Sequence, residues 1–537
     1  TDDSYNSNTG TGYSGLSTTS ITWVSSTAPI PFTTVTASNW NSTSTWNSAS
    51  VPNCSWAIVT IDDNTSIDVD VDAFMVTINS GKTLTINSGK SLTLCGPITN
   101  NGTVTVKEEA SFLDGGTMTG SGSYTLERPI DHSGWHYVSP PISSPTANSF
   151  WGSALYRYDE TTANWTAQNA GDNLTVCRGY DTWYKPAAAG TVNFTGTFNT
   201  GSQSISVTYT TASAPKTGWN LVGNPYPSYL DWDAAGWTKT NVNNAIYIWD
   251  EDQSNFTSYV TGSGGTNGGS RYIPPAQGFL VSASTTGASV AMTNACRVHN
   301  TVSFRAGAIG DLLRLKLSGL GYSDEAVIRF DPHASNDFDG SFDAFKVRSS
   351  NISTPQISTR SADMKELSIN TFAGLYQNIS VPLLARVGVS GEYELSINIF
   401  EFDQNTHLYL EDLQDGKIYD INQNSKLTFN FGVNDAAERF IIHFTPLPTL
   451  ESPVANGLDD AEEPISNVYS HDKDVYIDIF ENNHGYVHIY NMNADEIYNG
   501  ELRRSMNKIT LAEKANGYYF IKLILDKEVT THKVLIR

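Results

Sequence analysis

A tandem repeat of eight residues constrains the fold of this chain more than any other feature. Thr77-Ile-Asn-Ser-Gly-Lys-Thr-Leu84 is followed directly by Thr85-Ile-Asn-Ser-Gly-Lys-Ser-Leu92, and weaker copies occur at residues 101–106 and 120–126. Each copy places alternating apolar residues beside a Ser-Gly turn. Short repeats of this kind stack strands into a β-solenoid, because one copy cannot bury its apolar face alone. We therefore predict solenoid-like repeats over residues 51–128, with an ordinary meander of Asn-Gly hairpins as the alternative.

The residues before and after these repeats also read as β-structure. Residues 1–50 are rich in Ser, Thr and Asn and are predicted to form a loose arm or irregular edge strands. Residues 129–302 carry an internal duplication, with copies at about 129–215 and 216–302. For example, the segment from Gly134 to Pro141 (GWHYVSPP) is repeated from Gly218 to Pro225 (GWNLVGNP). Each copy is expected to form several short strands joined by Gly and Pro turns.

The C-terminal part alternates apolar and polar residues over long stretches. Leu313, Leu315 and Leu317 share one face of an expected strand, and the pattern continues through residues 303–446. Half-buried antiparallel strands show this pattern, and a β-sandwich or jelly roll closes about 140 such residues. Residues 447–465 contain prolines and an acidic cluster and are predicted to be a linker. Residues 466–537 alternate again and predict a small Ig-like β-sandwich, so the whole chain is predicted to be all-β.

The last of these segments resembles the C-terminal sorting domain of type IX secretion substrates in Bacteroidota. The resemblance covers about 70 residues and rests on three strand motifs, whose residues are Gly485, Val487, Ile489, Tyr490, Asn491, Gly517, Tyr519, Phe520, Lys522, Lys533 and Ile536. One position departs from the family pattern. The family usually has a glycine shortly after Tyr490-Asn491, where this chain has Ala494-Asp495.

The resemblance implies a route of export and a set of partners. A signal peptide, since removed, would direct the chain across the inner membrane, and Thr1-Asp2-Asp3-Ser4 reads as a start exposed by processing. The chain would then leave through the type IX translocon in the outer membrane. There a shuttle protein would read the sorting domain, and a sortase would commonly cleave it. The implied location is the cell surface or the extracellular space. Two upstream motifs, Trp135-His-Tyr-Val-Ser-Pro140 and Trp219-Asn-Leu-Val-Gly-Asn-Pro225, also resemble those of multidomain, adhesin-like surface proteins.

Charge and cysteine content agree with an exported protein. The formal net charge is −23, and no basic stripe is present, which argues against nucleic acid as a partner. The four cysteines, Cys54, Cys95, Cys177 and Cys296, form no CxxC motif. We expect disulfides Cys54–Cys95 and Cys177–Cys296, because each pair would lie within one predicted domain of a protein in an oxidising compartment. Buried free thiols are the alternative.

The strongest candidate metal site is an acidic turn within the predicted sandwich. Its oxygen ligands would be Asp331, Asn336, Asp337, Asp339 and Asp343, and closely spaced oxygens with a glycine turn suit Ca²⁺. The alternative is a turn capped by its own Asp and Asn side chains. Structural Ca²⁺ is the only cofactor that the sequence suggests.

Tryptophans gather in the duplicated region and suggest a second kind of site. Trp151, Trp165, Trp232 and Trp249 are candidates for stacking on sugar rings. Core packing is the alternative, and we favour it because several aromatic positions recur in both copies.

No catalytic constellation is visible in the sequence. There is no HExxH or GxSxG motif, and nothing marks a particular pair of carboxylates for glycoside hydrolysis. We therefore expect a non-enzymatic surface protein with a structural or adhesive role, in which exposed strand edges could pair between copies to form fibres. A polysaccharide-binding protein is the first alternative, and a secreted hydrolase is the second.

Overall fold

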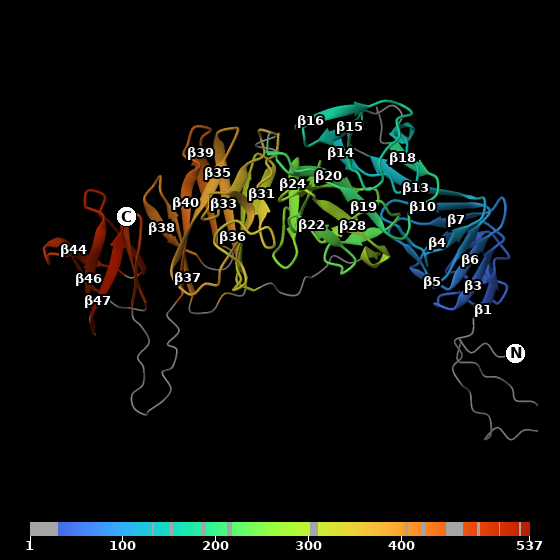
Figure 1. Ribbon diagram of the computed structural model, residues 1–537. Coiled ribbons are helices and arrows are strands. Elements are labelled where there is room, and N and C mark those ends of the chain that lie inside the picture. Colours follow the sequence, from blue (N-terminus) through green and yellow to red (C-terminus); the bar gives the residue numbers. More distant parts are fainter. Residues whose placement is uncertain are drawn as a thin grey trace, which may run out of the picture. The chain divides into compact units, whose positions relative to one another are not determined.

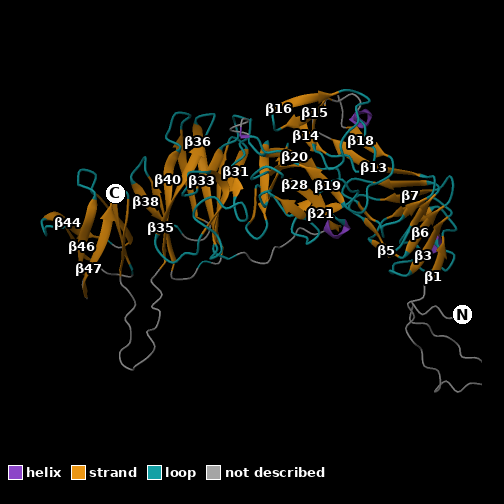
Figure 2. Cartoon of the chain, in the orientation of Figure 1, coloured by secondary structure: helices purple, strands orange, loops and turns teal. Residues whose placement is uncertain are grey.

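A computed structural model describes residues 30–130, 134–150, 154–184, 190–211, 217–300, 310–400, 402, 406–421, 425–446, 466–480, 484–503, 505–525 and 528–537. Nearly all regular structure in these ranges is β-strand, which confirms the all-β prediction (Figure 2). The helices that lie wholly within these ranges are the 3-10 turns η2 (Thr43–Thr45), η3 (Ala147–Phe150) and η5 (Asn294–Cys296). None of these described helices has the length and apolar character that a membrane crossing requires.

The chain divides into two compact units. The N-terminal unit comprises the described residues of Thr1–Asn241, Tyr272–Phe279 and Thr285–Ser303. The C-terminal unit comprises those of Val242–Arg271, Leu280–Ser284 and Phe304–Arg537.

The N-terminal unit begins with a β-solenoid whose three sides are parallel sheets (Figure 1). One sheet contains β1 (Ile30–Thr33), β3 (Ala57–Ile61), β6 (Met75–Ile78), β9 (Ile98–Asn100) and β12 (Met118–Thr119). The second contains β2 (Ser38–Asn39), β4 (Thr65–Ile67), β7 (Thr83–Ile86), β10 (Thr103–Val106) and β13 (Ser123–Ile130). The third contains β5 (Val71–Ala73), β8 (Ser91–Leu94) and β11 (Ser111–Leu113). Alternate residues of these strands point inward and form one apolar core.

The repeat unit of the solenoid is longer than the eight-residue motif. Thr103 pairs in register with Thr83 on one side and Ser123 on the other, so one turn takes 20 residues and three strands. The tandem copies mark two successive corners of a single turn, one between β6 and β7 and one between β7 and β8. Gly81 and Gly89 occupy these corners with φ of +76° and +66°, a conformation that favours glycine.

The solenoid starts earlier than residue 51, the boundary predicted from the sequence. β1 pairs in parallel with β3, with Ile30 opposite Ala57. Trp40 and Trp46 are buried, with ring centroids 4.7 Å apart. Irregular edge strands are therefore the correct description of residues 30–50, because these tryptophans supply the core at that end. Residues 1–29 of the predicted arm lie outside the described residues.

The rest of the N-terminal unit is built from short strands of the duplicated region. β18 (Gly190–Thr195) adds to the solenoid by pairing antiparallel with β13. One sheet has the order β14 (Gly134–Val138), β17 (Tyr180–Tyr184), β15 (Ala154–Asp159), β16 (Asn164–Gln168). A further strand of this region, β20 (Trp219–Gly223), lies outside that sheet. Two three-stranded sheets complete the unit. The first has the order β19 (Gln203–Ser206), β28 (Ser289–Met292), β22 (Thr238–Thr240). The second has the order β26 (Tyr272–Ile273), β21 (Tyr229–Asp231), β29 (Arg297–Val298).

The C-terminal unit repeats part of this arrangement. β23 (Ala245–Asp250) pairs with β24 (Asn255–Val260) on one side and, through Tyr247 and Leu280, with β27 (Gly278–Ser282) on the other. β25 (Gly264–Thr266) then pairs with β24. The order β27-β23-β24 corresponds to the order β17-β15-β16 in the N-terminal unit.

The predicted sandwich of residues 303–446 is one continuous sheet that folds over its own core. Its pairing order is β38 (Lys417–Asp420), β37 (Thr406–Asp412), β40 (Glu438–Pro446), β35 (Ile379–Arg386), β33 (Gln356–Arg360), β34 (Glu366–Phe372), β31 (Tyr322–Phe330), β30 (Leu312–Gly319), β36 (Gly391–Phe400), β39 (Ser425–Phe431), with β32 (Ala344–Phe345) beside β34. Phe429 of β39 and Phe440 of β40 lie 4.9 Å apart although their strands are far apart in this order. The two ends of the sheet therefore close over one core. We call this folded sheet the sandwich.

The C-terminal residues form a separate sandwich of two sheets. The first is β41 (Ser466–His471), β42 (Asp474–Ile479), β45 (Ser505–Thr510). The second is β44 (Glu496–Leu502), β43 (Gly485–Tyr490), β46 (Gly517–Leu525), β47 (Glu528–Ile536). Their inward residues form one apolar core, as predicted for residues 466–537.

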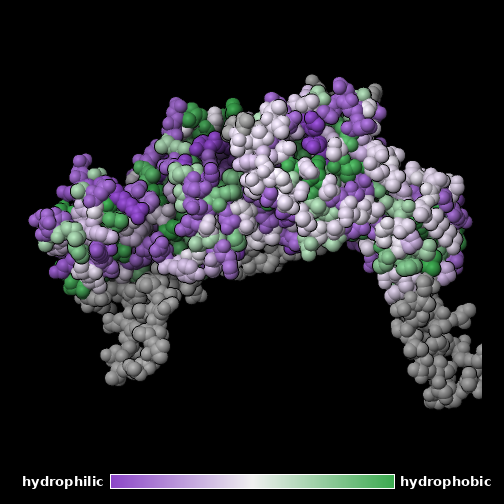
Figure 3. Space-filling view, in the orientation of Figure 1, coloured by the Kyte–Doolittle hydropathy of each residue, from purple (hydrophilic) through white to green (hydrophobic). Residues whose placement is uncertain are grey.

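The surface reflects the low content of charged residues. Much of the solenoid surface in the space-filling view is pale, as expected for Ser and Thr, whereas stronger purple is more frequent over the C-terminal strands (Figure 3).

Candidate functional site

The motif residues of the predicted sorting domain hold its two sheets together. Val487, Ile489, Tyr519 and Ile536 are buried in the shared core. Gly485 is required by its surroundings, because a Cβ there would lie 2.1 Å from the backbone oxygen of Ile524.

The strand motifs also define the turns of this domain. Tyr519 donates its hydroxyl to the backbone oxygen of Ala515 at 2.7 Å, which fixes the chain just before β46. Gly517 has a φ of +149° at the start of that strand. Asn491 accepts backbone hydrogen bonds from Asn493 and Asp495, at 2.9 and 3.0 Å, and so caps the turn between β43 and β44.

The remaining motif residues lie on the outer face of the second sheet. Nζ of Lys533 lies 3.9 Å from the centre of the Tyr518 ring, and Phe520 is the cross-strand neighbour of Lys533. Tyr490 donates to Glu496 at 3.2 Å, and His488, opposite Lys522 in the register, contacts the same carboxylate. These residues shape an exposed polar and aromatic surface, whereas the buried motif residues define the fold.

The departure from the family pattern falls at a position that favours glycine. Ala494 has a φ of +64° in the Asn491 turn. We expect Ala494→Gly to raise the unfolding free energy of this domain by about 1 kcal/mol, because an L side chain is strained in that conformation. Chemical denaturation followed by tyrosine fluorescence would measure the change. Ala515→Gly is the matched control and should be destabilising, because Ala515 is not in the left-handed region. A loss of stability in Ala494→Gly would contradict the prediction.

The sorting domain packs on the sandwich through polar and aromatic side chains. β42 is buried on both faces: Val475, Ile477 and Ile479 enter the domain's own core, and Tyr476 and Asp478 face the sandwich. The sandwich contributes a surface that we call the docking face, formed by Asn378, Ser380, His407, Tyr409, Glu411, His443 and Thr445.

Glu411 is the centre of this contact. Its side chain is buried, and its carboxylate accepts hydrogen bonds from Tyr476 at 2.7 Å and His443 at 3.1 Å and forms an ion pair with Lys508. Burial opposes ionisation of Glu411, but these three partners outweigh it and lower its pKa to about 2. The carboxylate is therefore held ionised by groups from both sides of the contact.

A second group of contacts flanks Glu411. Tyr409 donates to the buried Asp478 at 2.6 Å. Asn378 and Asn467 exchange two side-chain hydrogen bonds of 3.0 and 2.7 Å. The rings of His443 and Tyr476 lie 4.5 Å apart. This contact surface was not predicted from the sequence. The available signal was a set of strands whose apolar residues face a core and whose alternate residues are polar.

Acid is expected to weaken this contact through His443. Nε2 of His443 contacts Glu411 and Nδ1 contacts the Ser380 hydroxyl at 2.9 Å, which suits the neutral ring, and burial lowers the pKa of His443. A separated docking face would take up a proton near the ordinary pKa of about 6.5, so stability falls as the pH drops below that value. Burial raises the pKa of Asp478, which acts in the opposite direction.

The variant His443→Gln isolates this effect. The difference in unfolding midpoint between wild type and His443→Gln should shrink as the pH falls from 7 to 5, since only the wild type loses the contribution of the neutral ring. Thermal unfolding across this range measures the difference, and a constant difference would contradict the prediction.

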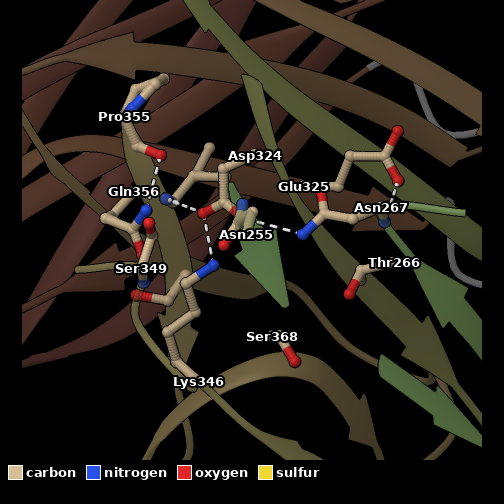
Figure 4. A network of polar contacts seen from close by, with 12 residues as sticks. Asn255, Thr266, Asn267, Asp324, Glu325, Lys346, Ser349, Pro355, Gln356 and Ser368 are labelled. Carbon is tan, nitrogen blue, oxygen red and sulfur yellow. Dashed lines mark hydrogen bonds and ion pairs between the residues drawn. The ribbon is translucent and has the colours of Figure 1, made fainter. Parts of the chain in front are cut away.

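A second polar network in the C-terminal unit is centred on Asp324 (Figure 4). Asp324 is buried and pairs with Lys346, which is also buried. Its carboxylate accepts from the Asn255 and Asn267 side chains at 2.9 and 3.0 Å and from the Ile357 backbone at 2.7 Å. The network therefore joins β24 and the residue after β25 to the sandwich.

The N-terminal unit contains a comparable ion pair. Asp114, which follows β11 of the solenoid, pairs with Arg297 of β29, and both side chains are almost fully buried. Burial opposes ionisation of Asp114, but Arg297 and a 2.5 Å hydrogen bond from Thr200 outweigh it and lower the pKa of Asp114. Arg297 also donates to the Phe112 backbone at 2.6 Å.

The five candidate calcium ligands lie in one turn but point to protein partners. Asp331 contacts Arg329 and His333, Asn336 accepts from the Ala373 backbone at 3.1 Å, and Asp339 caps Ser341 at 2.8 Å. Asp343 accepts from two backbone groups at 2.7 Å, and burial raises its pKa to about 7.

Asp337 lies in the same turn and accepts from Ser335 through its backbone oxygen at 2.7 Å. Across the described residues, no group of three or more His, Cys, Asp and Glu side chains is placed to hold a metal ion. These contacts agree with the self-capped turn, and Ca²⁺ binding here stays a prediction.

The candidate sugar-stacking tryptophans differ in their exposure to solvent. Trp232 is fully buried against Trp237, with centroids 4.8 Å apart, so it cannot stack on a ligand. Trp249 is half-buried and donates to Glu251 at 2.6 Å. Trp165 is 39% exposed. Trp151 lies outside the described residues.

An aromatic surface around Trp165 was not predicted from the sequence. The strand register places Trp135, Trp183, Tyr156, Tyr158 and Trp165 on one face of the sheet β14-β17-β15-β16. Trp135 is 38% exposed and lies 5.1 Å from Trp183, and Trp165 lies 5.1 Å from Tyr158. Alternation of aromatic residues along these strands was the available signal.

The predicted disulfides are not present, because all four cysteines are free thiols. Cys54 precedes β3 and is buried, whereas Cys95 follows β8 and is exposed, and these strands belong to different sheets of the solenoid. Cys177 and Cys296 are each buried, and burial raises the pKa of both thiols. The alternative of buried free thiols is therefore correct for Cys54, Cys177 and Cys296.

Comparison with known proteins identifies two parts of the chain. The profile of the secretion system C-terminal sorting domain matches residues 471–537. This match confirms the predicted sorting domain, so the chain is a type IX secretion substrate delivered to the cell surface or the extracellular space. A solved structure, "Biofilm associated protein - BSP domain", matches with 8% identity over 77% of this chain and a TM-score of 0.17. The chain spans 63% of the length of that structure. No curated protein matches the chain.

A second family profile, "Domain of unknown function (DUF8693)", matches residues 32–444, which include the solenoid, the duplicated modules and most of the sandwich. The chain therefore belongs to this family, with the type IX sorting domain attached to its C-terminal side.

Proposed function

We propose that this protein is a non-catalytic component of the cell surface with a structural or adhesive role. The observation that carries the proposal is the fusion of a sorting domain to β modules joined by buried ion pairs. Asp114–Arg297 ties the solenoid to the module that follows it. Asp324, which is paired with Lys346, accepts a hydrogen bond from Asn255 and so ties β24 to the sandwich. Within each unit, contacts of this kind hold neighbouring modules in fixed register, which suits a display or load-bearing role. The shuttle protein and the sortase are its proposed partners during export.

Fibre formation is part of this proposal, because the sheets end in strands that could pair with another copy. Electron microscopy of the protein taken from the native cell surface, with mass spectrometry of its C-terminus, tests it. Ordered filaments support a structural subunit. A strictly monomeric protein in sedimentation at high concentration would contradict the fibre.

A second candidate function is polysaccharide binding, favoured by the aromatic face around Trp135 and Trp165. Half-exposed aromatic rings bind sugars by stacking on their apolar faces. Affinity electrophoresis in gels containing polysaccharide tests this function with Trp135→Ala and Trp165→Ala. Retention of the wild type that both variants lose supports it. The buried Trp232 should not be substituted in this experiment, because its loss would disturb folding.

A further inference from the structure

We infer that the docking face of the sandwich is a binding site for the sorting domain as a separate polypeptide. The domain would remain bound after the chain between residues 446 and 466 is cut. The partner is thus residues 466–537 of this same protein. The inference does not depend on whether the exported protein is structural, adhesive or sugar-binding.

The chemistry of the contact favours a specific and lasting complex. On the sandwich side, Glu411 and His443 are buried, and on the sorting-domain side so are Tyr476 and Asp478. Each buried carboxylate is satisfied across the contact, Glu411 by Tyr476 and Lys508 and Asp478 by Tyr409. Paired charges with full hydrogen bonding and aromatic anchors characterise the strong centres of protein interfaces.

The aromatic rings add apolar burial to this polar pattern. Tyr469 and Tyr476 stack with centroids 5.1 Å apart and an interplanar angle of 14°, and His443 lies beside both. His407 packs on Phe480 with a centroid distance of 4.8 Å. Separation would expose this cluster to water and leave its hydrogen bonds to be replaced by solvent.

The sorting domain does not need the docking face in order to fold. Its two sheets enclose their own core, in which Val475, Val487, Ile521 and Ile536 are buried. The contact is therefore between two finished surfaces, as in a complex of two proteins. In such a complex, the covalent link adds effective concentration and creates none of the contacts.

The test uses the full chain with a site-specific protease sequence inserted between residues 455 and 456. After complete cleavage, confirmed by denaturing gel, the protein is run on size exclusion at about 1 μM, a concentration far below the effective concentration of a tethered domain. Residues 466–537 should elute together with the larger fragment. Separate elution of the two wild-type fragments would overturn the inference.

Two variants show whether the retained domain uses this face. Glu411→Gln removes the negative charge that pairs with Lys508 and accepts the hydrogen bond from Tyr476. Lys508→Met breaks the same ion pair from the side of the sorting domain. Each should raise the Kd between the fragments at least about tenfold. Because the substitutions lie on different domains, one remains informative if the other prevents folding, which circular dichroism would reveal.

Glu394→Gln is the matched control. Glu394 lies on the same sandwich and pairs with Lys426 at 2.9 Å on an exposed surface. Its Kd should equal that of the wild type. Unchanged retention in folded Glu411→Gln and Lys508→Met would show that the docking face does not hold the domain, and would overturn the inference.

Discussion

Lys346→Met is expected to lower the unfolding free energy of the C-terminal unit by about 3–5 kcal/mol, because it leaves a buried carboxylate without its cation. Asp324 would keep its hydrogen bonds from Asn255, Asn267 and Ile357, but no positive charge would balance it. Urea unfolding of the full chain, followed by tryptophan fluorescence, measures the loss.

Two comparisons separate the buried charge from loss of packing. The double variant Asp324→Leu/Lys346→Met should lose much less than Lys346→Met, since it buries no charge. Lys426→Met, which breaks the exposed pair with Glu394, should leave the transition almost unchanged. Equal unfolding free energies for Lys346→Met and Lys426→Met would show that the ion pair of Asp324 and Lys346 does not stabilise the C-terminal unit.

Arg297→Met should have an effect of similar size, about 3–5 kcal/mol, on the N-terminal unit. The substitution removes the partner of Asp114 and also the donors to Phe112 and Ser228. Thermal unfolding would show it as a lower midpoint for the transition that contains the solenoid.

The pH dependence of this loss identifies its cause. In the wild type, Arg297 helps to keep the pKa of Asp114 below its ordinary value of 3.8, so its stabilisation is present above that pH and is lost as the pH falls through the lowered pKa. In Arg297→Met, burial acts without the arginine, so Asp114 can become neutral at mild acid. The deficit of the variant should therefore be smaller at pH 4.5 than at pH 7.5.

Lys107→Met serves as the control for the N-terminal unit. Its partner Glu127 lies 2.7 Å away on the partly exposed surface of the solenoid. This substitution should cost less than about 1 kcal/mol. A deficit in Arg297→Met that is independent of pH would indicate that lost packing, and not the buried charge of Asp114, is responsible.

The sequence predicted those features that repeat or alternate locally. Leu313, Leu315 and Leu317 are buried on one face as expected, and the sorting motif was recognised because its residues fix turns and a core within a short segment. The start of the solenoid was missed because Trp40 and Trp46 enter its core from irregular backbone, which has no strand periodicity.

The buried polar centres could not be predicted for a different reason. Asp114 and Arg297 are separated by 183 residues, and Glu411 and Lys508 by 97. Each of these residues alone is compatible with a solvated surface, and only the tertiary arrangement buries it. The same reason explains Trp232, whose burial depends on neighbours such as Phe279.

The regular register of the solenoid makes its length adjustable in fixed steps. Since Thr83, Thr103 and Ser123 occupy equivalent positions on successive turns, removing the 20 residues from Thr83 to Gly102 would place Thr103 where Thr83 now pairs. A turn could be added in the same way, and each step changes the length by about 4.8 Å, the spacing between neighbouring strands. Selection could thus change the reach of a surface protein by duplicating or deleting a short stretch of DNA, without requiring a new core.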